Sequence, residues 1–122
     1  MHKPGKRPHG KAARTGYYSD CSVTAWSPQF PVGSGQVRTG GETTCSTYHI
    51  PLKLDTRTQV HPGGYEQGQR FSDLEGTYIT QWGPYGNCYD SQSYRGWAWG
   101  FQGVYAAQDT TSYFASPDAY CY

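Results

Sequence analysis

The sequence predicts an all-β protein, a small antiparallel β-sandwich held together by disulfides, with a small β-barrel as the alternative architecture. Only ten of the 122 residues are Val, Ile or Leu, whereas twenty are Phe, Trp or Tyr. Sixteen glycines and eight prolines supply turn signals along the chain, and strong helix formers are sparse. A chain of this length fits one domain, which we place at residues 20–122, preceded by an extended arm at residues 1–19.

The cysteines are the third observation that predicts this class. They lie at Cys21, Cys45, Cys88 and Cys121, without the short spacings of zinc or redox motifs. Three pairings are possible, and we expect Cys21–Cys45 and Cys88–Cys121, because each would join neighbouring strands. Two disulfides indicate an oxidising compartment, so we expect a secreted, extracellular protein. No apolar segment follows the basic N-terminus, which predicts a mature chain whose signal peptide has been replaced by Met1.

Short apolar and aromatic runs between turn signals predict the strands in order. They are Cys21–Ser27, Gln36–Thr39, Thr43–Thr58, Thr77–Trp82, Ser93–Ala106 and Thr110–Ala115. In the third strand Tyr48, Ile50, Leu52 and Leu54 alternate with polar residues, which predicts one buried face. Pro51 cannot donate to a strand ladder, so it places this strand at an edge or in a bulge. The polar segment 56–70 predicts a β-arch or a flexible loop.

The strand at 93–106 has two unlike faces. Its odd positions carry large side chains and its even positions carry small ones. Because ten aliphatic residues cannot fill a sandwich, we expect Trp97, Trp99 and Phe101 in the core. Tyr85, in a predicted hairpin turn, and Tyr94 are expected to be exposed as a possible ligand surface.

The N-terminal arm differs in charge from the rest of the chain. Residues 1–19 hold five basic residues and no acidic one, whereas residues 20–122 have a net formal charge of −4. The arm is therefore expected to be extended and disordered when free. Three roles remain open: an unstructured terminus, a tether to nucleic acid or an anionic surface, or a segment that orders on a partner protein. We favour the third, with these partner-binding residues: Lys3, Lys6, Arg7, Lys11, Arg14, Tyr17 and Tyr18.

The chemistry-bearing residues show no catalytic or metal-binding pattern. The four histidines are His2, His9, His49 and His61, and none has a metal-ligand spacing. No nucleophile motif is present, and the acidic residues in polar segments are expected to be solvated. We therefore expect no enzymatic activity, no metal and no cofactor.

Several short strings suggest a resemblance: CSVTAWSP, GGETTCS, IPLKLDTRT, YRGWAWG and a final YCY. Over residues 21–122 the chain resembles small secreted actinobacterial proteins with four cysteines, and most of all the adaptor subunits of umbrella toxin particles. In that family a β-sandwich bridges a lectin subunit to the repeats of a large toxin chain. The resemblance implies that Lys3–Tyr18 inserts into the cleft of a lectin-like subunit. It also implies that the acidic body docks on a repeat-containing toxin chain.

We therefore expect a secreted adaptor that joins protein partners in an antibacterial toxin complex used in interbacterial competition. Membrane insertion and nucleic-acid binding are not expected. The alternative is a protein that acts alone, either as a carbohydrate- or cell-surface-binding module or as a small antibacterial or inhibitor protein.

Overall fold

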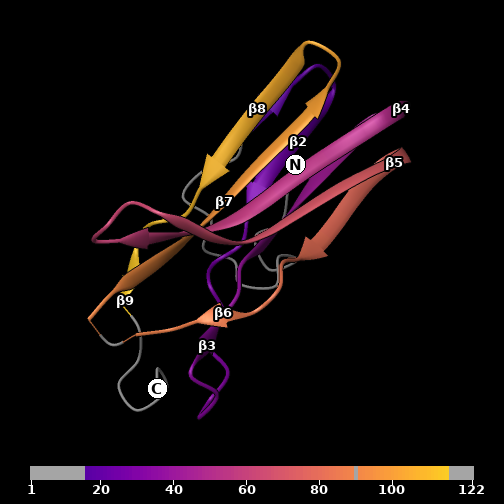
Figure 1. The fold of residues 1–122 in the computed structure, drawn as a ribbon. Helices are drawn as coiled ribbons and strands as arrows, with labels where there is room; N and C mark the ends of the chain where they lie inside the picture. Colours follow the sequence, from indigo (N-terminus) through magenta and orange to yellow (C-terminus); the bar gives the residue numbers. More distant parts are fainter. Residues whose placement is uncertain (1–15, 90, 116–122) are drawn as a thin grey trace.

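The protein is all-β, as predicted, in a computed structural model that describes residues 16–89 and 91–115 (Figure 1). The strands are β1 Gly16–Tyr18, β2 Cys21–Ala25, β3 Gln36–Val37, β4 Gly40–His61, β5 Glu66–Trp82, β6 Gly86–Asn87, β7 Ser93–Gln102, β8 Tyr105–Thr110 and β9 Phe114–Ala115. One sheet has the order β1-β2-β4-β7-β8, with β5 paired to β4 and β9 paired to β7. β3 and β6 form a small second sheet. In the described part of the chain, no helix is long and apolar enough to span a membrane.

A single long hairpin, β4 and β5, organises the fold. The two strands pair from Gly40↔Trp82 to Gln59↔Glu66, with register shifts between Thr44 and Leu52. At this irregularity the hairpin bends, and the positive φ of Gly76 (150°) accommodates the turn of β5. The first half of β4 then pairs with β2, and the second half pairs with β7. The bend therefore converts one sheet into two facing layers.

The opposite side of the molecule is nearly closed. A Cβ atom added to Gly16 of β1 would lie 3.2 Å from the Cβ of Ala107 in β8, although the two strands share no ladder. The sheet therefore resembles a barrel that is almost complete, which combines the predicted sandwich with its predicted alternative.

The interior combines a few aliphatic side chains with buried threonines. One cluster contains Tyr18, Cys21, Val23, Ala25, Cys45, Leu52, Leu54, Ile79 and Ala98. A second contains Val37, Val60, Cys88 and Tyr94, with Phe30 against it. Thr39 and Thr58 are fully buried and share a hydrogen bond of 2.9 Å between their hydroxyls. Threonines whose hydroxyls hydrogen-bond to each other thus occupy interior positions that aliphatic side chains fill in other proteins.

The prediction that Trp97, Trp99 and Phe101 fill the core is wrong. The small face of β7 is buried instead, and the large side chains point outward, with Trp99 37% exposed. The reason is the close approach of the facing layer. A Cβ atom on Gly41 would lie 3.0 Å from the Cβ of Ala98, which leaves no room for a ring between the layers.

Several predicted boundaries also shift. The expected strand at 93–106 is divided into β7 and β8 by a turn in which Gly103 has a positive φ of 60°. The segment 56–70 is neither an arch nor a flexible loop, because β4 continues to His61 and β5 begins at Glu66. The bulge predicted at Pro51 is confirmed by the register shift between His49 and Leu52. Because of this shift, Tyr48 and Ile50 are exposed while Leu52 is buried.

The predicted disulfide Cys21–Cys45 is present, with an S–S distance of 2.08 Å. It joins residues that are directly paired between β2 and β4. Cys88 is also disulfide-bonded, and Cys121, its predicted partner, lies outside the described residues.

Candidate partner-binding surfaces

The junction between the arm and the body is set by two adjacent tyrosines. The sheet begins at Gly16, so the end of the segment assigned to the arm belongs to β1, which pairs with β2. Tyr17 is 76% exposed, whereas Tyr18 is 6% exposed and its hydroxyl lies 3.3 Å from Thr43 Oγ1 in a hydrogen bond. Burial raises the pKa of Tyr18. Tyr18 therefore anchors β1, and Tyr17 is available to a partner.

The basic residues of the predicted site lie outside the described residues. They are Lys3, Lys6, Arg7, Lys11 and Arg14.

The two tyrosines predicted as a possible ligand surface have different environments. Tyr85 is exposed, as expected. Tyr94 is fully buried, so the expectation that it is exposed is wrong. It lies on the same face of β7 as the buried Ala98, and its hydroxyl accepts the Tyr89 N–H at 2.8 Å and donates to Gln92 Oε1 at 3.0 Å. Tyr94 is a structural residue.

The outward rings form an aromatic row, which we define as Trp97, Trp99 and Phe101 of β7 with Phe71 of β5. Consecutive ring centroids are 6.3 Å apart for the two tryptophans, 4.4 Å for Trp99 and Phe101, and 5.9 Å for Phe101 and Phe71. Trp99 and Phe101 are stacked face to face, so they cover part of each other's surface. Phe71 remains 50% exposed. The row extends from the outer face of β7 to β5.

A charged network lies beside this row on the outer face of β4. Asp55 is only 4% exposed and accepts a hydrogen bond from Arg57 Nη2 at 2.8 Å. Arg57 also donates from Nη1 to Glu66 at 2.7 Å, and the guanidinium of Arg57 lies 5.0 Å from the ring of Trp97. Hydrogen bonds to Asp55 and then Glu66 raise the pKa of Arg57 above its usual range. A bond from Gln59, followed by the one from Arg57, lowers the pKa of Glu66.

Sequence reasoning missed this network. The signal was present, because Lys53, Asp55, Arg57 and Gln59 alternate with the buried apolar and threonine positions of β4. Alternation places all four on the solvent side of one strand.

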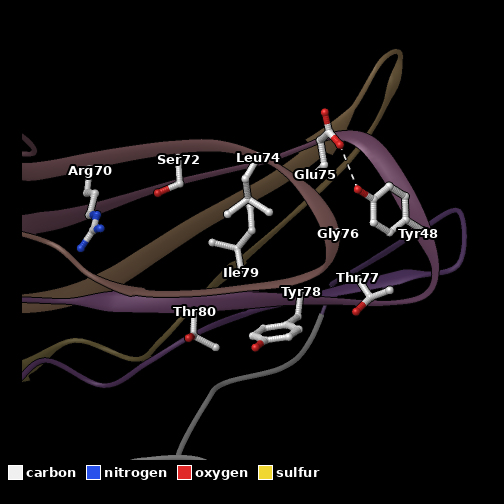
Figure 2. Close-up of a pocket in the computed structure, with 10 residues that line it drawn as sticks. All are labelled: Tyr48, Arg70, Ser72, Leu74, Glu75, Gly76, Thr77, Tyr78, Ile79 and Thr80. Carbon is white, nitrogen blue, oxygen red and sulfur yellow. Dashed lines mark hydrogen bonds between the residues drawn. The ribbon is translucent and has the colours of Figure 1, made fainter.

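A groove lies at the bend of β5 (Figure 2). It has a volume of about 510 Å³ and is lined by Tyr48 and by residues from Arg70 to Thr80. Figure 2 shows Leu74 and Ile79 pointing toward each other between the two halves of β5. On the rim, the Tyr48 hydroxyl donates to Glu75 Oε1 at 2.9 Å, which raises the pKa of Tyr48. Within the described residues β5 pairs only with β4, so the groove lies along an open sheet edge.

Asp20 organises the turn between β1 and β2. Its carboxylate accepts the Thr47 hydroxyl at 2.7 Å, the Thr47 N–H at 2.6 Å, the Ser46 hydroxyl at 2.9 Å and His49 Nε2 at 2.7 Å. These bonds, led by the one from the Thr47 hydroxyl, hold the pKa of Asp20 well below its usual range. These hydrogen bonds connect the turn between β1 and β2 to the irregular part of β4.

Cys21, Cys45 and His49 also lie together, with their potential ligand atoms within 4.8 Å of one another. Both sulfur atoms are joined in the disulfide, so neither is a thiolate able to bind a metal ion.

Together, the fold and these surfaces define a disulfide-bonded all-β domain with aromatic side chains exposed on more than one face. Comparisons of the chain with protein families, with curated proteins and with solved structures found no match.

Proposed function

We propose that the protein is a non-enzymatic, secreted adaptor that joins protein partners within an antibacterial toxin assembly. The observation that carries this proposal is the division of charge along the chain. The fifteen residues before β1 contain five basic residues and no acidic one, whereas the rest of the chain has a net formal charge of −4. A segment with five basic residues and no acidic one is attracted to an acidic cleft of a partner.

The arm inserts into a cleft of one partner, a lectin-like subunit, and the body docks on a second partner, a large repeat-containing toxin chain. Charge steers the encounter, and backbone hydrogen bonds with Tyr17 fix the register of the inserted segment. Because ordering a flexible segment costs entropy, the cleft must bury enough of the arm to offset that cost. The anchored Tyr18 supports this mechanism, since it fixes the point at which the arm leaves the body.

The disulfides support the extracellular location. Cys21 is bonded to Cys45, and Cys88 is disulfide-bonded too. Such bonds persist where the surroundings are oxidising.

Deletion of residues 1–15 tests the adaptor role. The tagged full chain and the truncated chain are each used to capture partners from the culture supernatant of the producing organism. We expect the deletion to abolish capture and to leave the melting temperature nearly unchanged. A variant with the same fifteen residues in scrambled order is the matched control. It keeps the net charge of the arm but changes the order of the side chains that would meet the cleft. If the truncated chain captures the same proteins as the full chain, the adaptor proposal is wrong.

One observation favours a second candidate function, a carbohydrate- or cell-surface-binding module that acts alone. The aromatic row lies on the outer face, where Phe71 and Trp99 are exposed beside charged and amide side chains. Sugars stack on such rings and bond to planar polar groups. Glycan-array binding that survives arm deletion and is lost in Phe71→Ala and Trp99→Ala would favour this candidate over the adaptor.

A further inference from the structure

Arg38 contacts two aromatic rings, at the end of the molecule that carries β3 and β6. Its guanidinium carbon lies 4.6 Å from the ring centroid of Trp82 and 4.7 Å from that of Tyr85. Its Nε donates to Gln29 Oε1 at 2.6 Å, and the backbones of Gln29 and Arg38 are bonded to each other at 2.9 and 3.1 Å. The side chain is thus held by hydrogen bonds at its backbone and at Nε, and its guanidinium contacts two rings.

The charge of Arg38 is not neutralised within residues 16–89 and 91–115. The ion pairs of that part of the chain that have a lysine or arginine as the cation involve Lys53 and Arg57. Arg57 contacts two carboxylates, whereas the terminal nitrogens of Arg38 have no hydrogen-bond partner among the described residues. A rigid, partly exposed guanidinium without an anion is suited to binding one from outside.

The geometry restricts which anion fits. The single Nε proton of Arg38 is used by Gln29, so the end of the guanidinium, with Nη1 and Nη2, is the edge that remains. Because two rings crowd the guanidinium, we infer that a ligand approaches in the guanidinium plane, at the edge formed by Nη1 and Nη2. A carboxylate is planar and accepts two parallel N–H bonds in that plane. A tetrahedral sulfate or phosphate extends above and below that plane and needs more space beside the two rings.

We propose that Arg38, Trp82 and Tyr85 form a binding site for a carboxylate group that a partner protein presents, either on an Asp or Glu side chain or at a chain terminus. The protein source of the carboxylate rests on the proposed adaptor function. A protein source is supported by the surroundings of Arg38. Tyr85, which contacts Arg38, and the neighbouring Pro84 are exposed and offer apolar contact to a peptide.

The site itself is tested with sodium acetate, by ¹H–¹⁵N NMR of the full chain. We expect saturable shifts of the Arg38 Nε–H and the Trp82 indole N–H signals, with much weaker responses to sodium chloride and sodium sulfate at matched ionic strength. Arg38→Lys keeps the charge but loses the planar pair of donors, so we expect acetate to bind about tenfold more weakly.

Arg95→Lys is the matched control, because Arg95 also donates from Nε to a glutamine, Gln59, at 2.7 Å and, among the described residues, contacts one ring, Tyr113. We expect unchanged acetate binding in this variant. Equal responses to all three salts, or unchanged acetate binding in Arg38→Lys, would overturn the site.

The source of the carboxylate is tested with two further probes, an acidic peptide with a free C-terminus and an oligogalacturonate. We expect the peptide to bind more tightly than acetate and to compete with it. Competition by the oligogalacturonate alone would overturn the protein source. Deletion of residues 1–15 should leave the acetate titration unchanged, so failure of the adaptor proposal is distinguishable from failure of this site.

Discussion

Gln81 of β5 donates a hydrogen bond from Nε2 to Thr56 Oγ1 of β4 at 3.0 Å, although the two residues lie in opposite halves of one hairpin. Gln81 also donates to the carbonyl of Arg70 at 3.1 Å and accepts a bond from the Ser72 hydroxyl. Its amide is buried and has a partner at both ends. This side chain therefore joins the two layers that the bend creates.

Replacement of Gln81 by Met should destabilise the protein. Removal of the amide leaves the buried Thr56 hydroxyl and Arg70 carbonyl without these bonds, which costs about 2–3 kcal/mol of unfolding free energy. Gln108→Met is the control, because Gln108 is exposed, and we expect a change within about 0.5 kcal/mol. Urea denaturation measures both. Equal losses in the two variants would show that Gln81 does not join the layers.

Ala98→Val should also destabilise the fold, because the small face of β7 is the buried one. Ala98 is fully buried against the backbone of Gly41, so two extra methyl groups should cost about 1–3 kcal/mol through overpacking. Ala106→Val, on the exposed surface of β8, is the same substitution without that contact. We expect it to leave the melting temperature nearly unchanged. A larger loss at Ala106 than at Ala98 would contradict the orientation of β7.

Loss of the Cys21–Cys45 disulfide should lower stability strongly. The bond closes a loop with a sequence separation of 24, for which the chain-entropy model gives about 3 kcal/mol. The double variant Cys21→Ser/Cys45→Ser is compared with the unreduced protein by thermal denaturation. Thiol titration of the native protein is the control, and four reactive thiols would exclude the disulfide assignment.

The stability of the protein should fall in acid partly through Asp20. Its native pKa lies well below the unfolded value, so the charged form stabilises the fold above about pH 4, and this contribution is lost as the pH falls below that. Asp20→Asn should therefore lower the melting temperature at pH 7, and the difference from wild type should shrink toward pH 2. Asp73→Asn, at an exposed position, is the control. A difference that stays constant with pH would rule out the titration of Asp20 as the cause.

Arg57→Gln should destabilise the outer face of β4. Asp55 is buried and would lose its hydrogen bond and ion pair with Arg57, at a cost of about 2–3 kcal/mol. Lys53→Gln is the control, because its ion pair with Asp73 is longer, at 4.0 Å, and partly exposed. Denaturant titration of both variants at pH 7 makes the comparison. A smaller loss for Arg57→Gln than for Lys53→Gln would contradict the network.

The surfaces could be predicted only in part. Exposure of Tyr85 followed from its position in a turn, because turns lie at the surface. The contact of Tyr85 with Arg38 did not follow, since Arg38 comes from a distant segment of the chain. Tyr94 and Ala98 both occupy even positions of β7 and therefore lie on the same face of the strand. Assigning the face with small side chains to the core would have predicted that Tyr94 is buried.

The sequence by itself determined the all-β class, the Cys21–Cys45 bond, the irregularity at Pro51 and the alternation of large and small residues along β7, because these depend on composition and on period-two spacing. Tertiary structure decided which face of β7 is buried. Alternation separates two faces but does not say which one meets the other layer. That choice depends on how closely the layers approach, and here Gly41 against Ala98 sets a distance that admits no ring. The bend of the β4–β5 hairpin creates those layers, and their close approach leaves Trp97, Trp99 and Phe101 outside.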